Sequence, residues 1–198
     1  MMMKMITPIS TINNYGDKLP DHVHIFSVEE HAHYKPMVLE SIEKMKADNN
    51  IKLNEKGYYY DFDIPEAKRI YEKLFRQITF PYIHDVGEMY GLCLDIKPPT
   101  IWFQQYIQGS DFGWHQHGGH WACIYYVELP EMSEATEFLN YGQFDVKEGD
   151  VIFFPTFLVH RSPMIKSNLR KTIIATNFTF AVDREMISNY GEEHFRHR

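Results

Sequence analysis

The chain has 198 residues, is 44% hydrophobic and carries a formal net charge of -7. The negative charge argues against nucleic acid or an anionic membrane as a partner, and no apolar run approaches the roughly 18 residues of a membrane span. Cys93 and Cys123 lack C-x-x-C spacing, and the first residues contain no apolar run typical of a signal peptide. These features predict one cytoplasmic domain without disulfide bonds.

The first part of the chain predicts one short strand and one helix. An irregular lead reaches to about residue 26 and includes "HVHIF", which is the expected strand. Residues 34–47 then place Val38, Ile42 and Met45 at helical spacing, with charged residues between them.

A second helix is predicted more strongly over residues 63–78. Asp63 is the expected N-cap and Pro65 lies in the expected first turn. The helix is expected to resume beyond Pro81 in "YIHDVGEMYGL". Its expected apolar stripe consists of Ile70, Leu74, Phe75 and Ile78.

From Pro98 onward, short runs rich in β-branched and aromatic residues alternate with turn sequences. The expected strands are "TIWFQQYI", "WACIYYVEL", "TEFLNY", "DVIFFPTFLVH" and "RKTIIATNFTFAV". Such spacing is typical of an antiparallel sandwich or barrel, and the helices can pack on the outer face of one sheet. We expect a mainly β single domain over 1–198, with N-terminal helices (1–97), a β core (98–183) and a C-terminal tail (184–198).

The stretch "WHQHGGH" suggests a metal site. On an extended strand, His115 and His117 would share one face, because strand side chains alternate. His160 closes the run "GDVIFFPTFLVH", and a neighbouring strand could bring it against the first pair. Imidazole suits iron, zinc, copper and nickel, and three ligands on one side leave positions open. A structural zinc site would normally need four protein ligands.

Each part of this pattern has an ordinary alternative. An isolated H-x-H is more often a surface feature, and a histidine after an apolar strand is usually a core or edge residue. The order of H-x-H, a Gly-Asp turn and a Pro-bent strand ending in histidine favours the metal site. No spacing argument includes His120.

Arg170 and Thr172 form a candidate carboxylate receptor. They are two residues apart on an expected strand, so they share a face. A guanidinium beside a hydroxyl suits a carboxylate. The alternative is that Arg170 is a solvent-exposed arginine at the strand start.

Residues 100–180 resemble the 2-oxoglutarate- and iron(II)-dependent dioxygenases. That family has His-x-Asp/Glu, a distal His, and an Arg about ten residues later, often as R-x-S/T. "YIQGSDFGWHQH" is similar to the prolyl-hydroxylase form of the first motif, and "CIYYVEL" is similar to a strand of oxygen-sensing prolyl hydroxylases. The matching positions are Tyr106, Gly109, Phe112, His115, His117, Tyr126, His160, Arg170 and Thr172.

This resemblance implies a double-stranded β-helix (jelly-roll) core and the use of Fe(II), 2-oxoglutarate and O2. Arg170, Thr172 and Tyr126 would hold the distal carboxylate of 2-oxoglutarate, with Tyr106 at the same site. The implied reaction hydroxylates an unidentified small molecule or protein, such as a peptidyl side chain, and decarboxylates 2-oxoglutarate to succinate.

The sequence departs from the family at the acid position, where it has His117. An imidazole there keeps a ligand but removes a negative charge. If His117 is not a ligand, Asp111 or His120 would complete the site.

Aromatic residues near the motif are expected around the pocket. For Trp102 we expect ordinary core packing. The tail "GEEHFRHR" could cap the site or mediate a homodimer. The candidate wall residues are Phe112, Trp114, His120 and Trp121.

Two other functions fit part of the pattern. A cupin-type dioxygenase shares the expected fold and can use three histidines without 2-oxoglutarate, but it usually has a Glu three to four residues after the H-x-H. A non-catalytic jelly-roll binding protein is the other alternative. Neither alternative requires Arg170.

Overall fold

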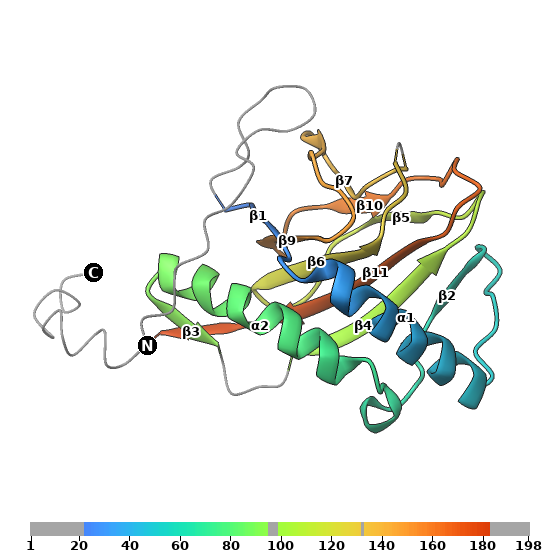
Figure 1. Cartoon of the computed structure of the whole chain (residues 1–198). Coiled ribbons are helices and arrows are strands. Elements are labelled where there is room, and N and C mark those ends of the chain that lie inside the picture. The colour runs from blue at the N-terminus through green and yellow to red at the C-terminus, as the bar shows by residue number, and fades with distance from the viewer. Residues whose placement is uncertain (1–21, 95–98, 132, 183–198) are drawn as a thin grey trace, which may run out of the picture.

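The computed structural model describes residues 22–94, 99–131 and 133–182. Two helices, a six-stranded sheet and a four-stranded sheet form its layers, as Figure 1 shows. The helices are α1 (His31–Asp48) and α2 (Glu72–Met89), with a 3-10 turn at Glu66–Lys68. The strands are β1 (His24–Ser27), β2 (Tyr58–Tyr60), β3 (Leu92–Leu94), β4 (Thr100–Tyr106), β5 (Phe112–His115), β6 (Trp121–Glu128), β7 (Glu137–Phe138), β8 (Gly142–Gln143), β9 (Asp150–Pro155), β10 (His160–Ser162), β11 (Lys171–Phe178) and β12 (Phe180–Val182).

The described strands pair antiparallel in three sheets. The large sheet has the order β1-β9-β6-β11-β4-β2, and the small sheet has the order β5-β10-β7-β8. A third sheet pairs β12 with β3. The expectation of a mainly β chain with antiparallel sheets and two helices is confirmed. The run "DVIFFPTFLVH" divides into β9 and β10, because a turn separates Pro155 from His160.

The large sheet has a core on each face, since strand side chains alternate. On its outer face, α1 and α2 cover one cluster, in which the predicted Val38, Ile42 and Met45 are buried. On its inner face, which looks toward the small sheet, a second cluster includes Ile124, Phe138 and Phe154. The inner cluster lies directly beneath the candidate site.

The second helix differs from its prediction at its start. Helix α2 begins at Glu72, so Asp63 is not its N-cap, and Ile70 is 46% exposed. Arg69 explains the delay, because its guanidinium donates to the Ile64 carbonyl, which a helix would use, and to the Ile101 carbonyl of β4. The helix runs through Pro81 without a break, whereas we expected it to stop near residue 78 and to resume beyond that proline.

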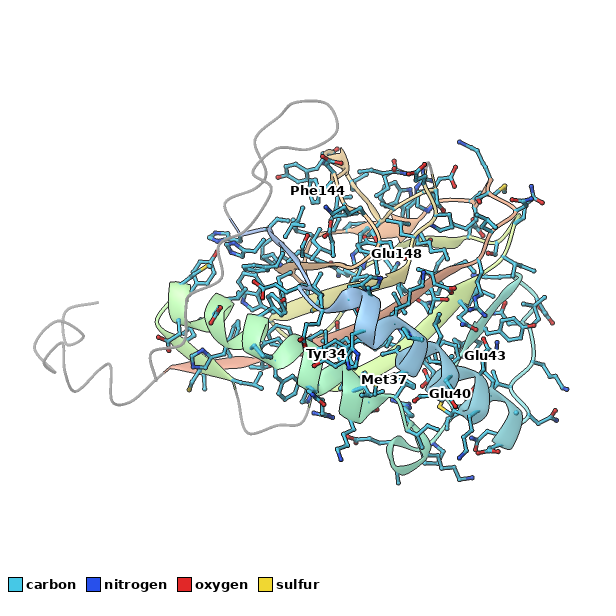
Figure 2. The ribbon with its side chains drawn as sticks, in the orientation of Figure 1. Tyr34, Met37, Glu40, Glu43, Phe144 and Glu148 are labelled. Carbon is cyan, nitrogen blue, oxygen red and sulfur yellow. The ribbon has the colours of Figure 1, made fainter. Side chains whose placement is uncertain are left out.

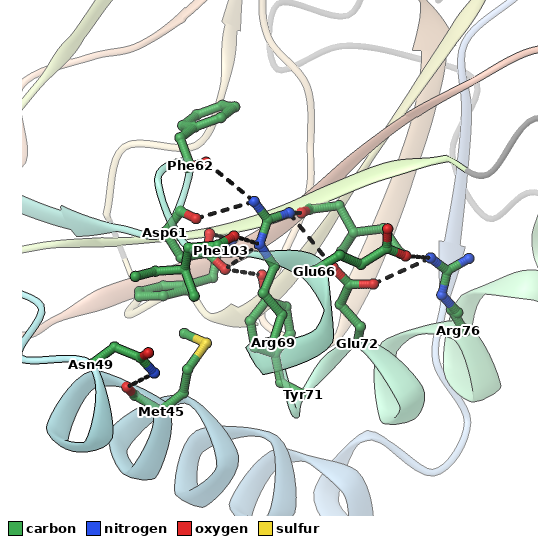
Figure 3. Close-up of polar contacts among 12 residues, drawn as sticks. Met45, Asn49, Asp61, Phe62, Glu66, Arg69, Tyr71, Glu72, Arg76 and Phe103 are labelled. Atoms are coloured by element: carbon green, nitrogen blue, oxygen red, sulfur yellow. Dashed lines mark hydrogen bonds and ion pairs between the residues drawn. The ribbon is translucent and has the colours of Figure 1, made fainter.

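Asp61 is the centre of a buried polar cluster between β2 and α2, shown in Figure 3. Its carboxylate accepts hydrogen bonds from the Phe103 backbone N–H, at 3.0 Å, and from the Tyr71 hydroxyl. The Arg69 guanidinium lies 3.5 Å from the same carboxylate, and Arg69 also donates to the Ile101 carbonyl. These bonds fix the loop that follows β2 against the edge of β4.

We expect Asp61→Ala to lower the free energy of unfolding by about 3–5 kcal/mol, because it leaves the buried Phe103 N–H and Tyr71 hydroxyl without their acceptor and removes the carboxylate that pairs with Arg69. Urea unfolding measures this change. Glu66→Ala is the matched control. Glu66 belongs to the same network through Arg76, but its side chain is 60% exposed, so the expected loss is below about 1 kcal/mol. Equal losses in the two variants would contradict a structural role for Asp61.

Acidic residues at both ends of α1 attach that helix to the large sheet. Glu43 lies on α1 and Glu148 lies beside its first turn, as Figure 2 shows. Lys35 pairs with Glu148 at 2.6 Å, and Arg170 pairs with Glu43 at 2.6 Å.

In the described part of the chain, neither helix has the length and apolar character that crossing a bilayer requires.

Candidate metal centre

Three histidines meet above the inner face of the large sheet. His115 ends β5 and His160 begins β10, and the two are direct partners in the strand register. His117 lies two residues beyond β5, where its backbone N–H donates to the Thr156 carbonyl at 3.3 Å. One ring nitrogen from each histidine lies within 4.8 Å of the others. The structure therefore brings the three predicted ligands together.

The H-x-H pair is arranged differently from the prediction. We expected both histidines on one extended strand, but β5 ends at His115. A turn that contains Gly119, with φ of +91°, carries the chain from His117 to β6. A Cβ atom at Gly119 would lie 3.4 Å from the Phe178 carbonyl oxygen, so the close approach also favours glycine. The turn, and not strand alternation, places His117 beside His115.

Backbone carbonyls fix the orientation of two of the rings. The Nδ1 atom of His115 lies 2.8 Å from the Gly113 carbonyl oxygen, and that of His160 lies 2.8 Å from the Leu158 carbonyl oxygen. A carbonyl can only accept, so both Nδ1 atoms carry the proton and both Nε2 atoms present a lone pair. The Nε2 atoms of His117 and His160 are 3.1 Å apart. Such carbonyl contacts are the usual support for imidazole ligands of metals.

The three rings are neutral at physiological pH. Burial, with contributions from the neighbouring His115 and His117, lowers the pKa of His160 to about 3. Burial, with a contribution from His115, lowers the pKa of His117 to about 4. The pKa of His115 is also lowered by burial. Neutral imidazole is the form that binds metals, so protons do not compete for this site near neutral pH.

The donor set fits a transition metal. Three neutral imidazoles on one side of an ion suit iron, zinc, copper or nickel and leave the remaining positions for other ligands. Among the described residues, neither Asp111 nor His120 belongs to the cluster. Among the described residues, the cluster therefore consists of three histidines and includes no carboxylate.

The cluster opens onto a pocket between the two sheets. The pocket extends along the inner face of β4 and β11. Its cavity volume is about 40 Å³, which is room for a metal ion with small ligands or for about three water molecules. A larger organic ligand would extend from the metal cluster toward the solvent-exposed part of the pocket.

Lys171 lies beside the pocket, next to the lining residues Tyr106 and Ser162, with its side chain fully buried. Its ammonium donates to the Glu134 carbonyl at 2.6 Å and to the Ser162 hydroxyl at 3.0 Å, and it lies 5.3 Å from the centre of the Tyr106 ring. The Glu134 carboxylate pairs with Lys166 instead. Burial lowers the pKa of Lys171 to about 7. A buried ammonium without a carboxylate partner is costly, and an anionic ligand would offset that cost.

Arg170 lies just before β11 and Thr172 lies on it, and both side chains point to the side of the sheet that faces α1. The Arg170 guanidinium pairs with Glu128 at 2.7 Å and with Glu43 at 2.6 Å, and the Thr172 hydroxyl donates to Glu128. Both side chains are therefore engaged on the outer side of the sheet, away from the three histidines. The alternation of the strand places the residue between them, Lys171, on the inner face.

The two tyrosines assigned to the co-substrate lie on the inner face. Tyr106 is buried and lines the pocket, and a hydrogen bond links its hydroxyl to Ser162. The Tyr126 hydroxyl donates to the Thr136 hydroxyl at 2.9 Å. Burial raises the pKa of both tyrosines, so both hydroxyls keep their protons and can donate.

The candidate wall residues divide into two groups. Phe112 lines the pocket. Trp114 is 43% exposed and does not line it, and His120 is exposed as well. Trp121 packs on the opposite face of the sheet, against Tyr90 of the helical layer. Trp114, His120 and Trp121 are thus not part of the pocket wall.

Sequence reasoning missed most of the residues that line the pocket, and Trp102, Asn177 and Phe62 are examples. Trp102 was expected in ordinary core packing; it is buried, yet it lines the pocket with its ring 5.4 Å from that of His117. The alternation along "RKTIIATN" could have identified Lys171 and Asn177, had the phase of the strand been known. Phe62 lies in a loop, where no periodic pattern marks a residue for the pocket.

No family model and no curated protein matches the sequence. Solved structures do match. An oxidoreductase of the 2OG-Fe(II) oxygenase family from Burkholderia pseudomallei has a TM-score of 0.56 at 11% identity, over 82% of this chain and 85% of that one. A prolyl-4-hydroxylase from Pseudomonas putida has a TM-score of 0.53 at 13% identity, over 80% and 92%. A prolyl hydroxylase from Trichoplax adhaerens, in complex with a peptide fragment of hypoxia inducible factor, has a TM-score of 0.59 at 11% identity, over 80% and 83%. The chain therefore has the fold of the 2-oxoglutarate- and iron(II)-dependent oxygenases.

Proposed function

We propose that the protein is a 2-oxoglutarate- and Fe(II)-dependent oxygenase that hydroxylates an unidentified small molecule or protein group. One observation supports this most directly. Three neutral imidazoles and a buried ammonium without a carboxylate partner belong to the same inner-face region. 2-Oxoglutarate combines a metal-chelating end with an anionic end, so it matches both features.

In this proposal, His115, His117 and His160 hold Fe(II) from one side. The bound iron supplies the oxidative chemistry that couples C–H hydroxylation with O2 to decarboxylation of 2-oxoglutarate. The three imidazoles leave the pocket side of the ion free for the co-substrate and O2. The aromatic walls of the pocket limit access of water.

Lys171, and not Arg170, receives the distal carboxylate in this proposal. Its ammonium would exchange the Glu134 carbonyl for the carboxylate, while Ser162 and the Tyr106 hydroxyl supply further donors. Arg170 and Thr172 support the sheet from its outer side through Glu128. Tyr126 orients the nearby Thr136 hydroxyl.

The experiment is to incubate the full chain with Fe(II), 2-oxoglutarate and O2 and to follow succinate by NMR. Slow succinate release is expected even without a substrate, and calorimetry under anaerobic conditions should show 2-oxoglutarate binding that depends on the metal. The zinc-substituted protein is the control, because zinc has no redox chemistry. The proposal fails if 2-oxoglutarate neither binds nor is consumed.

A cupin-type dioxygenase that does not use 2-oxoglutarate is the second candidate. The observation that favours it is the all-histidine cluster, which has no carboxylate in the described residues. This candidate gives no role to the buried Lys171. The same assay separates the two, because the cupin-type enzyme would bind iron and release no succinate.

The pH dependence of 2-oxoglutarate binding should show whether Lys171 binds the distal carboxylate. Its pKa is about 7 in the free protein, so the ammonium form is present below that pH and is lost as the pH rises. The carboxylates of 2-oxoglutarate stay ionised throughout this range. We expect the affinity to fall about tenfold per pH unit above pH 7, until the pH passes the raised pKa of the complex.

Calorimetry between pH 6 and pH 9 measures this dependence. Lys171→Arg is the matched control, because arginine stays charged over the whole range. The 2-oxoglutarate affinity of this variant should not change with pH over this range. An affinity of the wild-type protein that does not change between pH 7 and pH 9 would contradict the role of Lys171.

A further inference from the structure

The inner face of β11 is longer than the co-substrate. Lys171, Ile173, Ala175 and Asn177 alternate along this face, the last three line the pocket, and the first and last of the four are six residues apart. That separation is about 20 Å along a strand, whereas 2-oxoglutarate is much shorter. A 2-oxoglutarate carboxylate at Lys171 therefore leaves the Asn177 end of the floor for a different ligand.

Asn177 has an unused hydrogen-bonding atom at this end. Its Oδ1 atom is buried and has no hydrogen-bond partner among the described residues, while Asn177 itself lines the pocket. Its neighbours across the sheet are Thr100 on β4 and Ala122 on β6. Leaving a buried acceptor unpaired is unfavourable, so such atoms in native structures require an explanation.

An aromatic surface lies beside this unpaired atom. The Phe62 ring stacks on Trp102 with centroids 5.1 Å apart and planes at 29°, and the Trp102 ring contacts that of His117 at 5.4 Å. Both Phe62 and Trp102 line the pocket, and Phe62 is 48% exposed. The surface formed by Phe62 and Trp102 thus continues from the metal cluster to solvent.

Phe62 is held in place by the buried cluster of Figure 3. Its backbone carbonyl accepts a hydrogen bond from Arg69 at 3.3 Å, and the preceding residue, Asp61, is buried in that cluster. A single exposed phenylalanine is common on protein surfaces. Here the backbone is fixed, and the ring faces the same pocket as the unpaired Asn177 atom.

Arg161 is the charged side chain of the pocket that could attract an anionic substrate, but a carboxylate already pairs with it. Arg161 lines the pocket, but its guanidinium lies 2.7 Å from the Glu137 carboxylate and stacks on Trp114 at 4.5 Å. The open end is therefore apolar apart from the neutral Asn177 amide, whose Oδ1 atom is unpaired among the described residues. A charged substrate group would find no free counter-charge there among the described residues.

We propose that the open end of the pocket is a substrate subsite for a neutral apolar group that carries an N–H donor, as a secondary amide does. Asn177 Oδ1 accepts the hydrogen bond, and Phe62 and Trp102 pack against the apolar part. This rests on the proposed function for the identity of the neighbouring ligands, but the recognition itself is a property of these residues.

The test uses two probes of nearly equal shape, N-methylcyclopentanecarboxamide and methyl cyclopentanecarboxylate. The amide has an N–H where the ester has an oxygen. Their affinities for the full chain are measured by ligand-observed NMR, without metal and again with zinc and saturating 2-oxoglutarate. We expect the amide to bind about threefold to tenfold more tightly, the value of one neutral hydrogen bond.

Substitutions test which residues recognise the two probes. Asn177→Leu should abolish the preference for the amide, and Asn177→Ala serves the same purpose if the leucine variant does not fold. Phe62→Ala should weaken both probes by the same factor. Phe157→Ala is the matched control, because Phe157 is also an exposed phenylalanine, at 67%, and does not line the pocket; it should change neither affinity.

The outcomes are distinct from those of the oxygenase assay. Lack of binding by both probes, or an amide preference that survives Asn177→Leu, overturns the subsite. Competition between 2-oxoglutarate and the amide would also overturn it, because the two would share one place. If the probes bind as expected but no succinate is formed, the subsite stands and the proposed reaction is wrong.

Discussion

Replacing His160 with alanine is expected to reduce metal affinity by at least about 100-fold, since the loss of even a supporting contact around a metal ligand costs 10- to 100-fold. His160 is the most buried of the three histidines, and its Nε2 is oriented by the Leu158 carbonyl. Titration of the full chain with Fe(II) under anaerobic conditions, or with Co(II) followed by absorbance, measures the change.

His120→Ala is the matched control for this experiment. His120 belongs to the same short stretch, yet it is exposed and lies outside the cluster. The His120→Ala variant should bind metal with the affinity of the wild-type protein. His117→Ala should behave like His160→Ala if the imidazole occupies the position of the usual carboxylate. A His117→Ala variant with unchanged affinity would remove His117 from the ligand set.

The second large effect is expected at Lys171. Lys171→Met should weaken 2-oxoglutarate binding by about 100-fold or more, because truncating one partner of a buried charge pair costs about 2–5 kcal/mol. Metal affinity should stay the same, since Lys171 contacts none of the three histidines through a hydrogen bond. Calorimetry with the metal-saturated protein gives both quantities.

Arg170→Met provides the comparison on the neighbouring residue. The guanidinium is directed toward Glu128 and Glu43 on the other side of the sheet. We expect 2-oxoglutarate affinity to change less than about twofold, with a loss of about 1 kcal/mol in stability from a half-exposed pair. The reverse result, with Arg170 essential and Lys171 dispensable, would restore the original prediction from the sequence.

The strands and the histidine cluster could be predicted because their signals are local. Runs such as "WACIYYVEL" combine β-branched and aromatic residues, and turn residues separate them. The start of α2 could not be predicted in this way. Asp63 and Pro65 form a good helix start, but Arg69 donates to the Ile64 carbonyl of that segment and to the distant Ile101 carbonyl of β4. Propensity was overridden by a distant part of the fold.

The carboxylate receptor shows a different difficulty. In "RKTIIATN", apolar residues occupy both faces of β11, because the sheet is covered on both sides. The pattern therefore does not say whether Arg170 or Lys171 points inward, and an error of one residue exchanges the two faces. Only the packing of α1 against the outer face decides this.

The direct pairing of His115 with His160 has a consequence for the stability of the small sheet. The register between β5 and β10 is irregular beyond this pair, so few backbone bonds join the two strands. An ion coordinated by both histidines would cross-link β5 to β10 at this residue pair. Binding of a metal ion to both histidines would therefore stabilise this strand pairing and raise the stability of the folded protein.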